Sequence, residues 1–260
     1  MTWARERQIF YLGILIAVLL VFGFLIIYPY LNRAPTCTDG RQNGTESGVD
    51  CGGACKLACI AETDPISILW SRAFKVVPGR YNAVAYLANH NPNKVVEKIN
   101  YRFRFADENN VYIGKREGST FVPPAGKFAV FESAVDVGNS IPVYTSFEFT
   151  STPAWTQVDP QKVSQLKIAI GNIELTGETT SPHLTAVIKN NSLFYVPQVG
   201  VVAILYDALG NAVSVSRTFV DVLNGQESKE LNFTWPEPFT TPVVEKELLP
   251  LYNLSLVKLQ

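Results

Sequence analysis

The feature that most constrains this chain is an uninterrupted apolar run near the N-terminus, from Ile9 to Tyr30. No charged residue lies between Arg7 and Arg33, and leucine, isoleucine, valine and phenylalanine dominate. A helix needs roughly 20 apolar residues to cross a hydrocarbon core of ~30 Å, and it satisfies every backbone hydrogen bond internally, as lipid requires. The sequence therefore predicts a transmembrane helix over residues 9–30.

The charges that flank this run predict its orientation. Arg5, Arg7 and the amino terminus precede it, and only Arg33 follows closely. The positive-inside rule therefore places residues 1–8 in the cytoplasm. A cleaved signal peptide is the rival interpretation, but its apolar region usually has about 7–15 residues and ends at an A-x-A-like site. We expect an uncleaved, single-pass anchor in the cell membrane with the C-terminal domains outside.

The overall charge excludes one large class of partners. The chain has 22 Lys+Arg and 23 Asp+Glu, for a net charge of −1. Nucleic-acid binding relies on a basic surface, so no nucleic-acid partner is expected, and the bilayer is the partner that the sequence indicates directly. An aromatic content of 12% and 16 prolines suit a β-rich extracellular protein.

All four cysteines lie in one segment, residues 34–62, with the spacing C-x13-C-x3-C-x3-C. A zinc site favours C-x2-4-C pairs on both sides, and only half of that arrangement is present. An exported segment also lies in an oxidising compartment. Two disulfides are therefore favoured over zinc, and three pairings stay open for Cys37, Cys51, Cys55 and Cys59.

Between the cysteines runs the pattern C-x-D-G-x-x-N-G-x-E-x-G-x-D-C-G-G-x-C, over residues 37–55. This pattern resembles a short cysteine-rich module of exported bacterial and eukaryotic proteins. The resemblance covers about a tenth of the chain. It implies an extracellular spacer or linker module and no known enzymatic activity.

The same segment contains candidate calcium ligands. An EF-type loop places oxygen ligands at alternate positions, with glycine at the sixth and an acid at the twelfth. Counted from Asp39, this register puts Asn43, Gly44 and Asp50 at the fifth, sixth and twelfth positions, but a cation, Arg41, stands at the third. The alternative is that Asp, Asn and Gly build tight turns between disulfides. Asp39, Asn43 and Asp50 are the calcium candidates, and no other cofactor is predicted.

From residue 66 onward, short alternating apolar runs replace helical periodicity, which predicts antiparallel β-sandwiches. In one run, Tyr101, Phe103 and Phe105 alternate with Asn100, Arg102 and Arg104. Because side chains alternate across a strand, the aromatic residues should face a core and the polar residues the solvent. The same rule places Leu231, Phe233 and Trp235 inward.

The two halves of this region also resemble each other at an offset of about 100 residues. The matching pairs are residues 81–89 with 183–190, 101–107 with 201–207, and 123–126 with 223–225. We therefore expect an all-β fold with two tandem sandwiches, at 66–150 and 166–260. Residues 151–165 form the predicted linker, in which Trp155 should pack and restrain the joint.

Each copy has the size of an immunoglobulin-like or fibronectin-III-like sandwich, ~100 residues with about seven strands. The Cys…Trp…Cys arrangement of antibody domains is absent from both. Residues 183–235 resemble the FxLYD-type domain of exported bacterial proteins, through Leu205-Tyr206-Asp207, Gly210-Asn211 and Gly225. Ala203 stands where that family has an aromatic residue. The resemblance implies a largely non-catalytic β-sandwich.

Residues that could support catalysis are few and have no partners in sequence. Neither His90 nor His183 belongs to an H-x-x-H, H-E-x-x-H or G-x-S-x-G pattern. The acidic pairs are explained as solvated turns or strand faces: Asp107 with Glu108, Glu227 with Glu230, and Glu245 with Glu247. The tryptophans Trp70, Trp155 and Trp235 are predicted to pack in cores. We therefore expect no enzyme.

The sequence as a whole predicts a membrane-anchored, extracytoplasmic structural or interaction protein. It would bind an envelope protein or glycan through loops or an exposed strand edge. One alternative is an accessory subunit of a secretion or pilus-type assembly that uses the apolar helix as its interface. The other is a carbohydrate-active hydrolase, which would need two carboxylates in a cleft.

Overall fold

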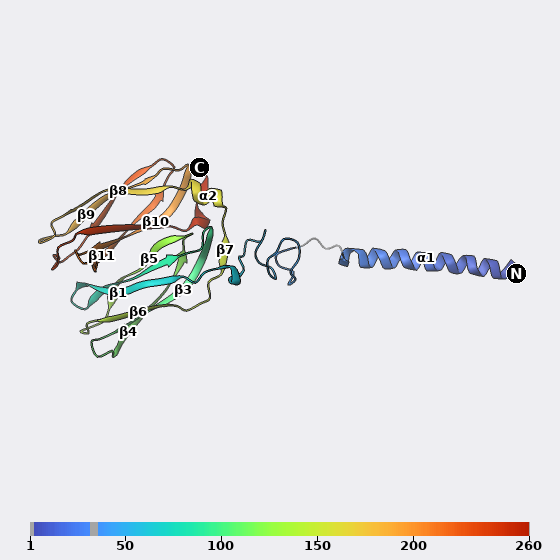
Figure 1. Ribbon diagram of the computed structural model, residues 1–260, viewed down its shortest axis with the longest axis horizontal. Coiled ribbons are helices and arrows are strands. Elements are labelled where there is room, and N and C mark those ends of the chain that lie inside the picture. Colours follow the sequence, from blue (N-terminus) through green and yellow to red (C-terminus); the bar gives the residue numbers. More distant parts are fainter. Residues whose placement is uncertain (1–2, 32–35, 260) are drawn as a thin grey trace.

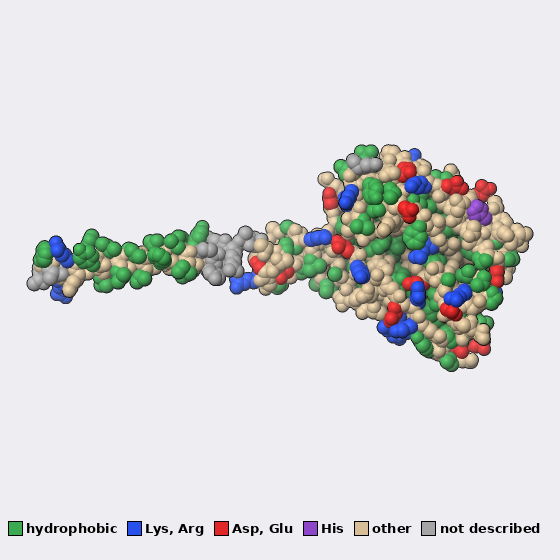
Figure 2. Space-filling model, turned by 180° about the vertical axis from the view of Figure 1, so that it is seen from behind, with side chains coloured by type: hydrophobic (Ala, Val, Ile, Leu, Met, Phe, Trp, Pro, Cys, Tyr) green, Lys and Arg blue, Asp and Glu red, His purple; other side chains and the backbone are tan. Residues whose placement is uncertain are grey.

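The computed structural model describes residues 3–31 and 36–259. The parts of the predicted segments that fall on residues 1–2, 32–35 and 260, Arg33 included, lie outside the described residues. Helix α1 (Trp3–Leu31) contains one stretch, Arg7–Tyr28, that is long and apolar enough to span a membrane, and none of it is buried against the rest of the protein. Figure 2 shows hydrophobic side chains along the visible face of this helix. The prediction of an apolar N-terminal helix is confirmed.

The first sandwich follows the cysteine-rich module and the short 3-10 helix η1 (Ile60–Glu62). Its sheets have the orders β1-β2-β5 and β4-β3-β6, with β7 also paired to β3. Every pairing in them is antiparallel. The strands are β1 (Ser67–Val77), β2 (Arg80–Asn89), β3 (Lys94–Ala106), β4 (Tyr112–Val122), β5 (Gly126–Asp136), β6 (Tyr144–Phe149) and β7 (Trp155–Gln157).

The second sandwich repeats this topology. Its sheets have the orders β8-β9-β12 and β11-β10-β13, with β14 paired to the start of β10 as β7 is to β3. The prediction of two tandem sandwiches in an all-β fold is confirmed. Its elements are α2 (Pro160–Gln165), β8 (Ile168–Thr176), β9 (His183–Asn190), β10 (Phe194–Tyr206), β11 (Ala212–Leu223), β12 (Ser228–Thr234), β13 (Glu245–Leu251), η2 (Leu254–Leu256) and β14 (Lys258–Leu259).

Equivalent turns in the two copies use the same chemistry. After β3, the Asp107 carboxylate accepts hydrogen bonds from the backbone N–H groups of Asn109 and Val111, both at 2.9 Å. After β10, Asp207 accepts from the equivalent positions 209 and 211, at 2.9 and 2.8 Å. An aspartate that bonds its own turn in this way ends one strand and starts the next.

Each sandwich also contains a buried asparagine that ties three loops together. Asn190 is fully buried, and its Nδ2 donates to the carbonyls of Phe194, Leu223 and Asn224 at 2.7, 3.3 and 3.0 Å. Its twin, Asn89, donates to the carbonyls of Lys94 and Pro123. These carbonyls lie at or just beyond the ends of strands, where the amide side chain provides them with buried hydrogen-bond donors.

A third hydrophobic core lies between the sandwiches, in addition to the core inside each. The outer face of β1-β2-β5 contributes Phe74, Val84, Tyr86, Ala129 and Phe131, and the outer face of β10 and β11 contributes Val202, Ile204 and Val215. Figure 1 shows the two sandwiches side by side, with β1 and β5 next to β10 and β11. A buried apolar layer of this kind joins the copies into one body.

The equivalent outer face in the first copy is charged and solvated. Arg102 on β3 bonds Glu117 at 2.6 Å and Glu148 at 3.2 Å, and Arg104 pairs with Glu148 at 3.1 Å. The aromatic residues that alternate with them, Phe103 and Phe105, are buried. The predicted half-buried strand is therefore confirmed.

The predicted linker, residues 151–165, contains regular structure of its own. It includes β7, which extends the first sandwich, and α2, whose N-cap Asp159 accepts a hydrogen bond from Gln161 N at 2.9 Å. Trp155 is 2% exposed and belongs to the core of the first sandwich. Packing of this tryptophan was predicted, and it restrains the connection.

Candidate functional site

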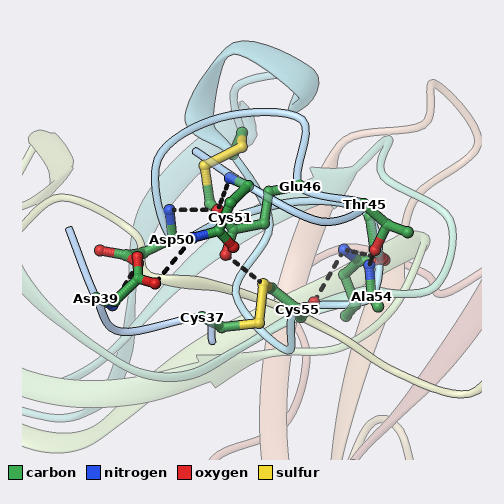
Figure 3. Close-up of a disulfide and its surroundings, with 12 residues drawn as sticks. Cys37, Asp39, Thr45, Glu46, Asp50, Cys51, Ala54 and Cys55 are labelled. Carbon is green, nitrogen blue, oxygen red and sulfur yellow. Dashed lines mark hydrogen bonds between the residues drawn. A yellow bond between two sulfur atoms is a disulfide. The ribbon is translucent and has the colours of Figure 1, made fainter. Parts of the chain in front are cut away.

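The cysteine-rich module is closed by two disulfides, Cys37–Cys55 and Cys51–Cys59. Among the described residues no cysteine is free. The prediction of disulfides is confirmed, and the structure chooses one of the three pairings that the spacing allowed. The Cys37–Cys55 bridge lies among the carboxylates and turns of the module (Figure 3).

The paired glycines Gly52 and Gly53 are required because two loops of the module pass close to each other at this point. Gly53 has a positive φ of +55°, and a side-chain Cβ there would lie 1.8 Å from the carbonyl oxygen of Thr45. A Cβ on Gly52, at φ +75°, would lie 2.6 Å from Ser47 Oγ. Gly53 therefore excludes any larger residue because the backbone of another loop passes too close, whereas Gly52 is required by its positive φ and by the Ser47 side chain beside it.

The three calcium candidates lie together, but their carboxylates are used within the module. Asp50 accepts from the backbone N–H groups of Asp39 and Gly40 at 2.9 Å, as Figure 3 shows in part. Asp39 accepts from Arg41 N at 3.0 Å and from Asn43 Nδ2 at 2.8 Å, and the Asn43 bond lowers the pKa of Asp39. The arrangement matches the alternative interpretation, in which these residues build turns.

One other group in the described part of the chain has the compactness of a metal site, namely Cys37, Glu46 and Cys55. Its two sulfurs are bonded to each other, so neither is the thiolate that a metal requires. Glu46 instead accepts backbone N–H groups of Asn43 and Asp50 at 3.2 and 3.3 Å. This group therefore offers a metal only one carboxylate.

The module is hydrogen-bonded to the first sandwich along β7. Ala58 N donates to the Trp155 carbonyl at 2.9 Å, and Gln157 N donates to the Lys56 carbonyl at 2.7 Å. The Lys56 ammonium also pairs with Glu97 on β3 at 2.8 Å. Main-chain bonds on both sides extend the sheet into the module, so the module and the sandwich move together.

The histidines and acidic pairs have structural roles. His90 follows β2 and contacts Ser67 Oγ at 3.0 Å, whereas His183 begins β9 and contacts Asn232 Oδ1 at 3.0 Å. They therefore lie at opposite ends of equivalent strands. Glu247 accepts hydrogen bonds from the phenols of Tyr86 and Tyr206, at 2.7 and 2.9 Å, between the sandwiches.

Exposed apolar side chains gather at the end of the sandwiches that lies opposite the module. The module bonds β7 and the start of β3, and strands β3 and β10, with 13 residues each, span about 40 Å from there. The β3–β4 and β10–β11 turns, which follow the other ends of these strands, lie at the far end (Figure 1). We call this end the distal loop surface, and its exposed apolar residues are Val111, Tyr112, Ile141, Val143, Tyr144, Leu209 and Val244.

Two tyrosines form the most regular part of this surface. Tyr112 on β4 and Tyr144 on β6 are both paired with Ala106 of β3, so they flank one small residue on the same face of the sheet. Their exposed fractions are 60% and 55%. A shallow hollow of about 440 Å³ lies beside them, lined also by Arg72 and Arg104. Aromatic rings beside guanidinium groups are well suited to contact a partner.

Sequence reasoning did not identify the distal loop surface. The signal was present, because Val111 and Tyr112 follow the polar turn Asp-Glu-Asn-Asn, and Ile141 and Val143 lie in the loop before β6. Large apolar residues in solvent-facing turns are unusual enough to mark a contact surface when several of them meet. Only the fold shows that these loops meet.

Comparison with known proteins adds no family. No protein-family model matches the chain. No curated protein matches it either. The resemblances to the cysteine-rich module and to the FxLYD-type domain therefore stay predictions.

Proposed function

We propose that this protein is a membrane-anchored, extracytoplasmic binding protein without catalytic activity, which holds a rigid pair of sandwiches away from the bilayer. Helix α1 serves as its uncleaved anchor. The module and both sandwiches form one continuous support, because β7 bonds the module and an apolar core joins the copies. The single observation that carries the proposal is the distal loop surface, where apolar side chains of both copies are exposed.

The partner in this proposal is another envelope component, a protein or a glycan, that contacts the distal loops. Loops on a rigid scaffold present side chains at little entropic cost. The surface charge elsewhere is mixed: in the face seen in Figure 2, Lys and Arg side chains alternate with Asp and Glu over the sandwiches. Such a surface favours recognition by local shape and apolar contact over long-range attraction.

Site-specific photocrosslinking in intact cells tests the proposal. A photoreactive residue at position 209, in the distal loop surface, should crosslink one envelope component reproducibly. Leu193 is the matched control, because it is also an exposed leucine (65% against 86% for Leu209) but lies in the turn before β10, at the opposite end. The proposal is refuted if both positions give the same adducts, or if position 209 gives none.

Deletion of residues 1–33 separates this proposal from the alternative in which the helix is the interface. A secreted protein that lacks the helix should keep its distal crosslink when added to cells from outside. Loss of the crosslink while the sandwiches stay folded would indicate that the helix itself provides the interface.

A further inference from the structure

A second site lies in the lateral cleft where the two sandwiches meet. The cleft has a volume of about 180 Å³ and is formed by β4 and β5 of the first copy and by β10 and β11 of the second. Its lining is mostly apolar, and a few polar side chains point toward it, which is typical of ligand sites at domain interfaces. The cleft is separate from the hollow beside Tyr112 and Tyr144.

Arg217 on β11 is the charged group in this cleft. Its guanidinium lies between two aromatic rings, 4.9 Å from the centroid of Phe131 and 4.7 Å from that of Phe219. One of its amino groups donates to the Phe131 carbonyl at 3.2 Å. The other donors of its five-donor fork have no hydrogen-bond partner among the described residues, so they are free to bind a ligand.

No carboxylate of the described chain is paired with Arg217. Glu132 is the carboxylate that acts on Arg217, without a hydrogen bond to it, and its charge is shared: Oε1 accepts from the Tyr101 phenol at 2.7 Å and Oε2 from Arg116 Nε at 3.1 Å. Partial burial of the guanidinium lowers the pKa of Arg217, Glu132 acts in the opposite direction, and the residue as a whole stays exposed to solvent. Arg217 shares this one nearby carboxylate with Arg116 and reaches solvent through the cleft, so its guanidinium can bind a ligand anion there.

Phe219 provides the surface against which the body of such a ligand would pack. Its side chain is 60% exposed, which is unusual for a phenylalanine in a strand that also lines a cleft. The ring lies against Gly200 of β10, where an added Cβ would be 3.3 Å from Phe219 Cε1. The glycine lets the ring lie close to the sheet beside the Arg217 guanidinium.

We propose that this cleft binds a carboxylate attached to an apolar body about the size of one amino-acid residue. The carboxylate bonds the free edge of the Arg217 guanidinium, and the apolar body covers Phe219. Arginine and carboxylate match each other in a planar, two-bond geometry. Two sources have this chemistry, a small organic acid and the C-terminal residue of a polypeptide.

Ligand-observed NMR on the full chain in detergent micelles tests this site, with N-acetyl-L-phenylalanine as the probe. The acid should bind, and N-acetyl-L-phenylalaninamide, which has the same body without the charge, should bind at least about tenfold more weakly. A hexapeptide that ends in phenylalanine distinguishes the sources: tighter binding than the single residue indicates a polypeptide terminus, and equal binding indicates a small acid. Absence of acid binding, or equal binding of acid and amide, overturns the proposal.

Variants locate the binding on the protein. Arg217→Gln should abolish binding, whereas Arg72→Gln, which removes an exposed guanidinium in the other hollow, should leave it unchanged. Arg217 also ties the sandwiches together, so an unfolding curve is recorded for each variant. Phe219→Ala is the second variant, because its ring is largely exposed and its loss should weaken acid binding without unfolding. Unchanged binding in either Arg217→Gln or Phe219→Ala refutes the site.

Discussion

Replacement of Asn190 by alanine is expected to destabilise the second sandwich strongly. The side chain is fully buried and makes five hydrogen bonds: three donated by Nδ2 to backbone carbonyls, and two accepted by Oδ1 from the N–H and the hydroxyl of Ser192. Alanine removes all five and leaves their partners in a buried place.

The magnitude follows from the number of groups left unpaired. Each buried polar group without a partner costs about 1–3 kcal/mol. Asn224 is only half-buried, so water can reach part of the site, and we expect a total loss of about 3–5 kcal/mol in the free energy of unfolding. Asn190→Asp is a sharper variant, because it places an acceptor where three carbonyl oxygens also accept.

The pH dependence of Asn190→Asp has a definite sign. A buried carboxyl among carbonyls favours its protonated form, so its folded-state pKa is raised above the unfolded value of about 3.9. The variant should therefore be most stable, relative to the parent, below that unfolded pKa. It should lose stability as the pH rises through the raised folded-state pKa.

Urea unfolding of the full chain in detergent micelles, followed by tryptophan fluorescence, measures these effects. Trp235 reports on the second sandwich and Trp155 on the first. Asn191→Ala is the matched control, because this neighbour is exposed and should change stability by less than ~0.5 kcal/mol. Asn89→Ala should produce the same effect in the first copy. The reasoning is refuted if Asn190→Ala is as stable as Asn191→Ala.

Three further predictions test the contacts that hold the module and the two sandwiches together. Ile204→Asp places an unpaired charge in the core between the sandwiches, where Ile204 is 0% exposed, and should separate the two copies. Small-angle scattering should then show that the protein has expanded. Arg104→Ser is the control, because it changes the equivalent but exposed position of β3 and should cause no expansion. Cys51→Ser opens a loop with a sequence separation of 8 and should lower the stability of the module by about 2–3 kcal/mol. Limited proteolysis should then cleave faster within residues 37–62 while the sandwiches stay intact. Burial and the bond to Glu247 raise the pKa values of Tyr86 and Tyr206 above 10. The two phenols therefore contribute fully to the free energy of unfolding below about pH 10, and this contribution is lost as the pH rises above that value. A variant with phenylalanine at both positions should lose less stability than the parent over that alkaline range.

Local patterns were sufficient for much of this fold. The apolar run over residues 9–30 predicts a helix on length alone, and alternation in Tyr101–Phe105 predicts which side chains are buried, because both depend only on neighbours in the chain. Disulfides were predicted from the spacing of the clustered cysteines and from the oxidising compartment expected for an exported segment. Their pairing was not, because it depends on how the loops of the module cross, and Gly53 passes Thr45 only in the folded module.

Two strands that meet at the contact between the sandwiches lack the alternation of apolar and polar residues seen in β3. Strand β10 contains the continuous apolar run Val-Gly-Val-Val-Ala-Ile-Leu, over residues 199–205, and β2 contains Ala-Val-Ala-Tyr-Leu-Ala, over residues 83–88. A strand without alternation is buried on both faces. These two runs therefore marked the outer faces that meet in the core between the copies, whereas Arg102 and Arg104 marked a face that stays in water.

The chain alone predicts the apolar helix, the disulfide-rich segment, the β class and the repeat at about 100 residues, because each depends on composition or on spacing along the chain. The folded structure is needed to see which outer face covers which, how the cysteines pair, and that loops from both copies meet at one end. It also placed Arg217 of the second copy against Phe131 of the first. These features depend on contacts between residues far apart in sequence, and such contacts exist only after the two sandwiches have packed.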